Sequence, residues 1–312
     1  LNEVERAQIA GFVINRFRGD ASLLGDAIDY TTRHTGKPVL GTVPYLKGLG
    51  LPEEDSVSFK EGGIHQGPAP ADRIDIAVLD MPHISNFTDF DALSIEPDLH
   101  VRVVHQLNEL GQPDAVIIPG SKNVLGDLVY LRESGLAERI TELAHDDGCE
   151  IIGICGGFQI LGQQISDPHG IESDGNSLLG LGLLPVDTVL AEQKTTIQTR
   201  SRHLPSGHEL LGYEIHHGQT PAEGLTPIAH NRDGELIGGS VNDGRIWGTY
   251  LHGVFDADGF RRWFIDGLRS KRGWSTDGKI RASYDLEPAF DRLADTVREA
   301  LDMKAIYRSI GL

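Results

Sequence analysis

The chain has 312 residues, a hydrophobic fraction of 39% and a formal net charge of −18 at pH 7. This length allows two domains, and the hydrophobic fraction suits a packed core rather than a disordered chain. The acidic excess argues against a nucleic-acid partner, because phosphate neutralisation needs clustered Lys and Arg. No apolar run approaches the ~20 residues that span a bilayer, and the first residues lack the pattern of a signal peptide. We therefore expect no membrane partner and a cytoplasmic protein.

The cysteines support the same compartment. Cys149 and Cys155 are the two cysteines of the sequence, and they lie too close together to close a useful disulfide loop. Free thiols are typical of a reducing compartment.

The first 58 residues predict part of a parallel sheet. Segments with strand, helix and strand character follow one another at residues 9–17, 21–36 and 38–45. This order forms a βαβ unit. Residues 59–73 are rich in Gly, Pro and Ala and lack periodicity, so we expect a linker there, between domains at 1–58 and 74–312.

The second domain predicts an open, largely parallel α/β sheet flanked by helices. Strand-like runs lie at residues 74–82, 101–106, 113–120 and 149–154, with a long amphipathic helix at 123–145. Their alternation is typical of a parallel sheet. Beyond residue 178, short β-like pieces separated by Gly, Asn and Pro predict an antiparallel section. Residues 288–312 predict a terminal helix.

Cys155 lies where a buried strand meets a predicted helix, in the stretch EIIGICGGFQILG. Gly153, Gly156 and Gly157 leave room for a sharp turn, which would hold the cysteine side chain above the sheet edge as in a nucleophile elbow. The helix would direct the positive end of its dipole at the sulfur. A small buried hydrophobic cysteine is the alternative, but the surrounding glycines favour a nucleophile.

A thiolate nucleophile needs a proton donor and groups that stabilise an oxyanion. His252 ends an apolar strand and precedes a glycine, so it is the candidate proton donor, with a structural histidine as the alternative. Gly120 and Ser121 also end a strand. We expect the backbone amides of their turn, with that of Gly156, to face the sulfur at one edge of the sheet.

The adjacent His216 and His217 do not predict a metal site. On a strand they would point to opposite faces, although one of them could line the pocket. No HExxH or paired CxxC spacing occurs in the sequence. We therefore expect no metal in this domain.

Several stretches together resemble a known family. Four stretches resemble the glutamine amidotransferase domain of the cobalamin-pathway amidases of the cobyric acid synthase type: PGSKN, GICGGFQILG, GYEIHHG and GTYLHGVFD. Three further stretches resemble the end of the synthetase domain of that family: GFVINRFRGDASLL, TGKPVLGTVPYL and LPEEDSVSF. The resemblance covers nearly the whole chain. It implies a class I amidotransferase fold, preceded at residues 1–58 by the C-terminal part of a P-loop-type synthetase domain.

The resemblance implies a glutamine-hydrolysing amide ligase. Cys155 would attack the side-chain amide of glutamine, His252 would protonate the departing ammonia, and water would release glutamate from the thioester. Gly120, Ser121 and Gly156 would contact glutamine and the oxyanion. A synthetase site with ATP and Mg²⁺ would use the ammonia to amidate peripheral carboxylates of adenosylcobyrinic acid a,c-diamide, giving adenosylcobyric acid. The implied partners are glutamine and this corrinoid; the glutaminase domain needs no cofactor, and the oligomeric state stays open.

Two features depart from the family pattern. Many class I amidotransferases carry a glutamate two residues after the histidine, whereas this chain has Val254, so we expect a dyad, with Glu214 or Asp256 as candidate orienting acids. The sequence has no GxxxxGK[ST] phosphate-binding loop. We therefore expect a fragment or processed remainder of a longer enzyme that does not ligate by itself. Asn15 in the first strand region is the candidate adenine contact.

Two other functions remain open. A related amidotransferase would act on the a,c carboxylates of cobyrinic acid or on a cell-wall lipid precursor, but the stretches NRFRGD and PEEDSVSF favour cobyric acid formation. A non-catalytic binding module on the same fold is disfavoured by the intact cysteine, histidine and glycine turns.

Overall fold

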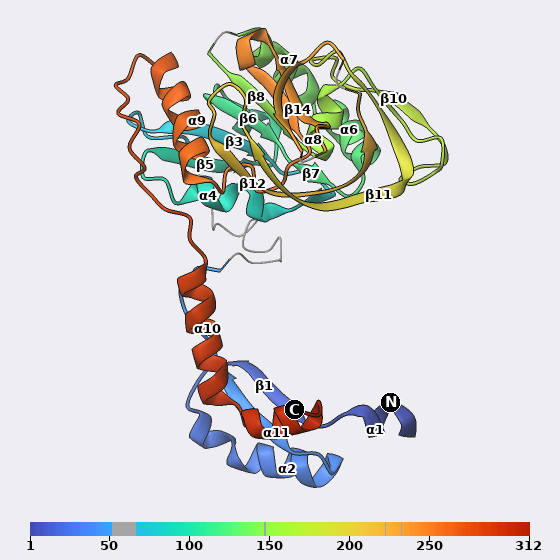
Figure 1. The fold of residues 1–312 in the computed structure, drawn as a ribbon, viewed down its shortest axis with the longest axis vertical. Helices are drawn as coiled ribbons and strands as arrows, with labels where there is room; N and C mark the ends of the chain where they lie inside the picture. The colour runs from blue at the N-terminus through green and yellow to red at the C-terminus, as the bar shows by residue number, and fades with distance from the viewer. Residues whose placement is uncertain (52–66, 147, 222, 232) are drawn as a thin grey trace. The chain divides into compact units, whose positions relative to one another are not determined.

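The computed structural model describes residues 1–51, 67–146, 148–221, 223–231 and 233–312. The chain divides into two compact units, which we call unit 1 (Leu1–Leu51 with Asp285–Leu312) and unit 2 (Pro52–Tyr284) (Figure 1). The linker expected at 59–73 lies mostly outside the described residues. Every helix in the described part of the chain is too short or too polar to cross a bilayer.

Unit 1 contains the predicted βαβ arrangement. Its elements are α1 (Glu3–Gln8), β1 (Phe12–Phe17), the 3-10 helix η1 (Ala21–Leu24), α2 (Gly25–Thr35), β2 (Val39–Pro44), α10 (Glu287–Ala300) and α11 (Met303–Ser309). β1 and β2 pair in parallel, with α2 between them in sequence. The backbone amide of Asp302 donates to the carbonyl of Leu40 at 2.7 Å, and Leu301 forms a bridge with Gly41.

Residues 285–312 therefore pack with the N-terminal segment, which differs from the expected domain at 74–312. They form two helices rather than one. Their contact with β2 joins residues far apart in the sequence, so the helical spacing of the tail held no information about where it packs.

Unit 2 is built on a mostly parallel central sheet. In order across the sheet the strands are β13 (Thr226–His230), β14 (Leu236–Val241), β15 (Ile246–Thr249), β8 (Glu150–Ile154), β6 (Ala115–Ile118), β3 (Ile74–Leu79) and β5 (Leu99–Val104). The five strands from β15 to β5 in this order run parallel to one another, whereas β14 runs antiparallel to both of its neighbours, β13 and β15. β3, β6 and β8 are buried along their whole length, as expected for parallel strands covered on both faces. The predicted α/β class is confirmed.

Helices cover both faces of this sheet (Figure 1). The main ones are α6 (Val124–Glu133), α7 (Leu136–His145), α8 (Gly156–Leu161) and α9 (Asp258–Lys271). Successive residues of a strand point to opposite faces. On β15, Trp247 packs edge-on against Phe260 and Phe264 of α9. The next residue, Gly248, leaves the space that Phe158 of α8 fills on the other face.

Smaller elements complete unit 2. A second sheet has the order β10 (Ser177–Leu179), β9 (Gln164–Ser166), β11 (Asp187–Arg202), β12 (Glu209–Gln219), and β4 (Ile84–Ser85) pairs with β7 (Gly120–Ser121). The short helices are η2 (Phe87–Phe90), α4 (Asp91–Ser94), α5 (Leu107–Leu110) and η3 (Asn242–Gly244). The predicted helix at 123–145 is two helices, α6 and α7, because Gly135 between them has a φ of 76°, a left-handed conformation that ends a helix.

Candidate active site

Cys155 occupies a strained turn between β8 and α8. Its φ is 50° and its ψ is −103°, a backbone conformation that is unusual for a residue with a side chain. The neighbouring glycines are required by close packing. A Cβ at Gly153 would lie 2.5 Å from the carbonyl group of Gly157, and one at Gly157 would overlap the carbonyl oxygen of Ile118. The strand, turn and helix predicted around Cys155 are therefore present.

His252 follows β15 and contacts Cys155. Cys155 is near enough to help raise the pKa of the imidazole, and Nδ1 of His252 lies 2.8 Å from Oδ2 of Asp89. Because Nδ1 is occupied by Asp89, Nε2 is the nitrogen left for the sulfur. The imidazole also stacks on the ring of Tyr213, with centroids 5.2 Å apart. The structure thus brings together the two side chains that the sequence selected as nucleophile and proton donor.

Asp89 is the orienting acid that sequence reasoning missed. It lies in η2, is 1% exposed, and accepts a second hydrogen bond from the backbone amide of Gly253 at 2.8 Å. The expected dyad is wrong, because Asp89 completes a chain of three groups. Of the two acids considered, Glu214 instead accepts from the Thr199 hydroxyl at 2.6 Å.

The sequence held little signal for this role. Asp89 precedes His252 by 163 positions, and no motif spacing links them. Asp256, the other acid considered, is half-buried and experiences the charge of Asp89, and its Oδ1 has no hydrogen-bond partner among the described residues. What marks Asp89 is its burial, which only the structure shows, because a buried carboxylate is costly without partners.

The charges at this site favour an imidazolium. Burial would lower the pKa of His252, but the charge and hydrogen bond of Asp89, together with Cys155, outweigh burial and raise that pKa to about 10. Burial and the charge of Asp89 raise the pKa of Asp256 to about 7 and that of Asp91 to about 6. His252 therefore carries a proton at neutral pH, and Asp256 carries only part of a charge there.

Gly120 and Ser121 lie beside the turn of Cys155. A Cβ at Gly156 would lie 2.9 Å from the backbone nitrogen of Ser121, and one at Gly120 would lie 3.1 Å from Cε1 of His252. Both glycines thus allow backbone to approach the site closely. The arrangement gathers the residues that the sequence selected as oxyanion contacts.

Gln159 is a second residue that the sequence analysis did not select. It lies one helical turn after Cys155 on α8 and is 2% exposed. Its Oε1 has no hydrogen-bond partner among the described residues. A buried acceptor without a partner is uncommon, so this atom is available to a donor group of a bound molecule.

The remaining predicted residues lie elsewhere or are engaged. Asn15 is on β1 in unit 1, where its Oδ1 accepts from the backbone amide of Arg16 at 2.9 Å. On β12, His216 stacks on Tyr250 with centroids 3.8 Å apart, whereas Nδ1 of His217 lies 2.9 Å from the carbonyl oxygen of Ala191. The two histidines therefore have separate environments. The adenine contact proposed for Asn15 stays a prediction.

The site is nearly closed by β12. Cys155 is 6% exposed and His252 is 1% exposed. The carbonyl oxygen of Ile215 lies 3.9 Å from the sulfur, and the side-chain amide of Asn86 donates to the hydroxyl of Tyr213. A substrate must therefore displace part of this cover to reach the sulfur.

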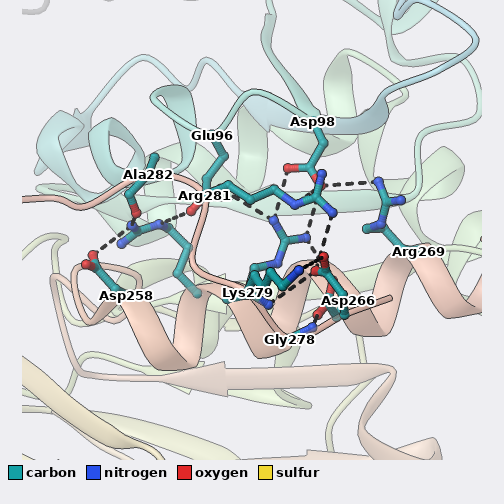
Figure 2. Close-up of polar contacts among 12 residues, drawn as sticks. Glu96, Asp98, Asp258, Asp266, Arg269, Gly278, Lys279, Arg281 and Ala282 are labelled. Atoms are coloured by element: carbon teal, nitrogen blue, oxygen red, sulfur yellow. Dashed lines mark hydrogen bonds and ion pairs between the residues drawn. The ribbon is translucent and has the colours of Figure 1, made fainter. Parts of the chain in front are cut away.

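An ion-pair network joins the segment after η2 to the loop after β15. Arg261 of α9 is fully buried; its Nε donates to Glu96 at 2.8 Å, and its Nη1 donates to the carbonyls of Phe255 and Asp256. Figure 2 shows Glu96 and Asp98 together at the basic side chains of this network. Because these bonds connect both segments to one helix, they limit movement between Asp89 and the histidine loop.

Comparisons with known proteins identify relatives of this chain. Residues 75–260 match the model of the CobB/CobQ-like glutamine amidotransferase domain. A cobyric acid synthase of Nitratidesulfovibrio vulgaris is 48% identical over an alignment that covers all of this chain and 65% of that protein. The adenosylcobalamin biosynthesis bifunctional protein CobDQ of Leptospira interrogans is 47% identical, with all of this chain and 36% of that protein covered. A solved glutamine amidotransferase has a TM-score of 0.47 at 16% identity, covering 62% of this chain and 98% of that one.

The chain thus spans 65% and 36% of the lengths of these two curated relatives. The matched residues 75–260 make up more than half of the chain and include the Cys155 turn, His252 and Asp89. On this match, the chain belongs to the CobB/CobQ-like glutamine amidotransferase family.

Proposed function

We propose that this chain hydrolyses glutamine at Cys155 and supplies the ammonia to an amide ligase of the cobyric acid synthase type. The observation that carries this assignment is the grouping of a thiol, an imidazole and a carboxylate: Asp89 is bonded to His252, and Cys155 acts on the pKa of the same imidazole. Family membership and the names of the curated relatives support the same activity.

The geometry supports a two-step thioester reaction. The sulfur of Cys155 forms a bond to the amide carbon of glutamine, and the carbonyl electrons move onto oxygen. As the C–N bond breaks, the imidazolium of His252 gives its proton to the nitrogen, which leaves as ammonia. Water then attacks the thioester and loses a proton to the imidazole, and glutamate and the thiolate are released. Asp89 holds the imidazole in the orientation that both proton transfers need.

Backbone amides would stabilise the oxyanion. Ser121 and Gly156, the residue after Cys155, approach each other closely, which supports their N–H groups as donors to the oxygen that gains charge. Gln159 offers its unpaired Oε1 one turn further along α8, where it would accept from a donor group of glutamine. This division leaves covalent chemistry to Cys155 and recognition to the turns around it.

The ligase half of the reaction would amidate peripheral carboxylates of adenosylcobyrinic acid a,c-diamide to give adenosylcobyric acid, with ATP and Mg²⁺ activating each carboxylate. The sequence has no GxxxxGK[ST] loop to hold the phosphates of ATP. We therefore derive no ligase step from this chain. We assign the N-terminal segment of unit 1 to a synthetase domain, with Asn15 as its adenine contact, and we place the protein in the cytoplasm, which suits its free thiols.

The test is glutamate release from glutamine by the chain and its two cysteine variants. Cys155→Ala should lower kcat by at least about 10³-fold, because no other group can form the thioester. Cys149→Ala is the matched control, since Cys149 is also buried, at 2% exposure, and we expect it to retain activity. A glutamine-like chloroketone should label Cys155 in a peptide map. Full activity in Cys155→Ala, or no glutamate release by the unmodified chain, contradicts the assignment.

A further inference from the structure

We propose that Asp127 is a positioning residue that holds the oxyanion-binding backbone of β7 in place. This inference rests on the function proposed above and adds a residue that neither the sequence motifs nor the contacts of Cys155 single out. Asp127 lies in the first turn of α6 and is fully buried. It would act through Ser121 and would not touch the substrate.

The carboxylate of Asp127 ties together the two strands of the small β4 and β7 sheet. Its Oδ2 accepts from the hydroxyl of Ser121 at 2.6 Å. Its Oδ1 accepts from the backbone amide of His83 at 3.0 Å and lies 2.9 Å from Nδ1 of the same residue. Ser121 is in β7, and His83 directly precedes β4. A buried carboxylate needs several hydrogen bonds to be tolerated, and all of these bonds go to the two strands.

The hydroxyl of Ser121 connects Asp127 to the backbone of the next residues. It donates to Asp127 and also accepts from the amide of Asn123 at 2.9 Å. The side chain of Asn123 in turn caps α6 by accepting from the amide of Gly126 at 2.9 Å. Ser121 and Asn123 are therefore held by their side chains, and Lys122 between them is held by its backbone bond to His83. The backbone amide of Ser121 has little freedom to change direction.

The strand pairing aims that amide at the site. β4 and β7 are antiparallel, with Ile84 opposite Ser121, and the amide of Lys122 donates to the carbonyl of His83 at 2.9 Å. Amides alternate in direction along a strand, so the amide of Ser121 points away from β4. Gly156, the residue after Cys155, is a close neighbour of this amide, because a Cβ there would be 2.9 Å from the Ser121 nitrogen.

Catalysis by such an amide depends on its placement. An oxyanion-hole donor acts at about 2.7–3.1 Å from the position that the oxyanion takes, and loss of one donor lowers kcat by about 10²–10³-fold. Without Asp127, the hydroxyl of Ser121 and the amide and ring of His83 lose their shared acceptor. The amide of Ser121 would then no longer be held at a fixed distance from the sulfur.

The experiment measures kcat, KM and thiol alkylation for Asp127→Asn, Ser121→Ala and the double variant. We expect Asp127→Asn to lower kcat for glutamate release by about 10–10²-fold with KM changed by less than about threefold. Alkylation of Cys155 by iodoacetamide, followed by peptide mapping, should keep the unmodified rate, because it needs the thiolate and no oxyanion contact. The double variant should be no slower than the slower single variant, because both changes remove the same bond.

Asp75→Asn is the control for general loss of stability. Asp75 is also a buried carboxylate, at 7% exposure, and pairs with Arg102 at 2.8 Å; it lies near the start of β3, at the end of the parallel sheet opposite to Ser121. We expect it to lower the melting temperature and to leave kcat of the folded protein unchanged. If Asp127→Asn does not fold, Ser121→Ala alone carries the test.

The outcomes separate this inference from the proposed function. An unmodified kcat in Asp127→Asn and Ser121→Ala, in a protein whose activity depends on Cys155, overturns the role of Asp127 and leaves the glutaminase assignment standing. Equal losses of kcat and alkylation rate also overturn it, because they would place the damage at the nucleophile. If the unmodified chain releases no glutamate, the proposed function itself fails.

Discussion

The two compact units differ in how much of their chain they bury. Unit 2 has a continuous apolar core that includes β3, β6 and β8, whereas Val43 is the single buried residue among the described residues of unit 1. Hydrophobic stabilisation grows with the apolar area removed from water. We therefore expect unit 2 to unfold cooperatively and unit 1 to open at a lower free energy. The comparison teaches that a correct βαβ pattern does not by itself provide a core.

The largest effect that would test this comparison comes from two glycines. Gly157→Ala in unit 2 would place a Cβ on the carbonyl oxygen of Ile118, and Gly41→Ala in unit 1 would place one on the carbonyl oxygen of Ala300. We expect Gly157→Ala to cost more than about 4 kcal/mol and to abolish both the melting transition and activity, because backbone on both sides must move. Gly41→Ala should abolish the protection of backbone amides against hydrogen exchange in unit 1 alone.

Hydrogen exchange measured by mass spectrometry distinguishes the two variants. In Gly41→Ala, the amides of residues 39–43 should exchange rapidly while amides of Ala115–Ile118 keep their protection. Gly36→Ala is a control at a glycine with open space around it, although its φ of 70° makes a small cost certain. A loss of protection in both units from Gly41→Ala would show that they unfold together and would break the comparison.

Asp89→Asn has the next largest expected effect. Removing its charge should lower the pKa of His252 from about 10, because burial then dominates, and kcat should fall by about 10²–10⁴-fold. The pKa of His252 in the folded protein lies above its ordinary value of 6.5. The contribution of the ion pair to stability is therefore full below pH 6.5 and is lost as the pH rises through about 10.

Melting temperatures of the unmodified chain and Asp89→Asn at several pH values check this sign. The difference between them should be largest near pH 6 and should shrink toward pH 10. A constant difference would mean that Asp89 acts through its bond to Gly253 and not through the charge of the imidazole.

Asp256→Asn should have the smallest effect, with the opposite sign. Burial and the charge of Asp89 raise the pKa of Asp256 from 3.8 to about 7. Ionising it in the folded protein is unfavourable, so this group reduces stability progressively as the pH rises from about 4 through 7. We expect Asp256→Asn to raise the melting temperature by a few degrees at pH 8.5 and to give no gain at pH 4. A gain of equal size at both values would exclude ionisation as its cause.

Local patterns in the sequence predicted the parts of the site that depend on neighbouring residues. The turn of Cys155 needs adjacent glycines, and His252, Gly120 and Ser121 each follow a strand of the parallel sheet within three residues, so the sheet brings them to one edge. The resemblance selected the same residues. Contacts between distant segments were not predictable in this way. Asp89 is in a short 3-10 helix without periodicity, and its role depends on a hydrogen bond to a loop 163 positions later.

The fold shows the same limit. Alternating apolar runs predicted the strands of unit 2 because each buried strand has its own local signature. The break between α6 and α7 was missed, since a single Gly135 inside an amphipathic pattern is compatible with a continuous helix. The packing of residues 285–312 against β2 depends on the hydrogen bond from Asp302 to Leu40, which no periodicity encodes.

Because Asp89 precedes Cys155 in the chain, activity at the site can report whether two separate pieces of unit 2 have assembled. A cut at the exposed Gly111, between α5 and β6, would leave the acid with β3 and β5 on one piece and the sulfur and imidazole on the other. Turnover would then return only when the two pieces had reassembled the sheet with β3 beside β6. The rate of glutamate release would then measure how much of the sheet had reassembled from the two pieces.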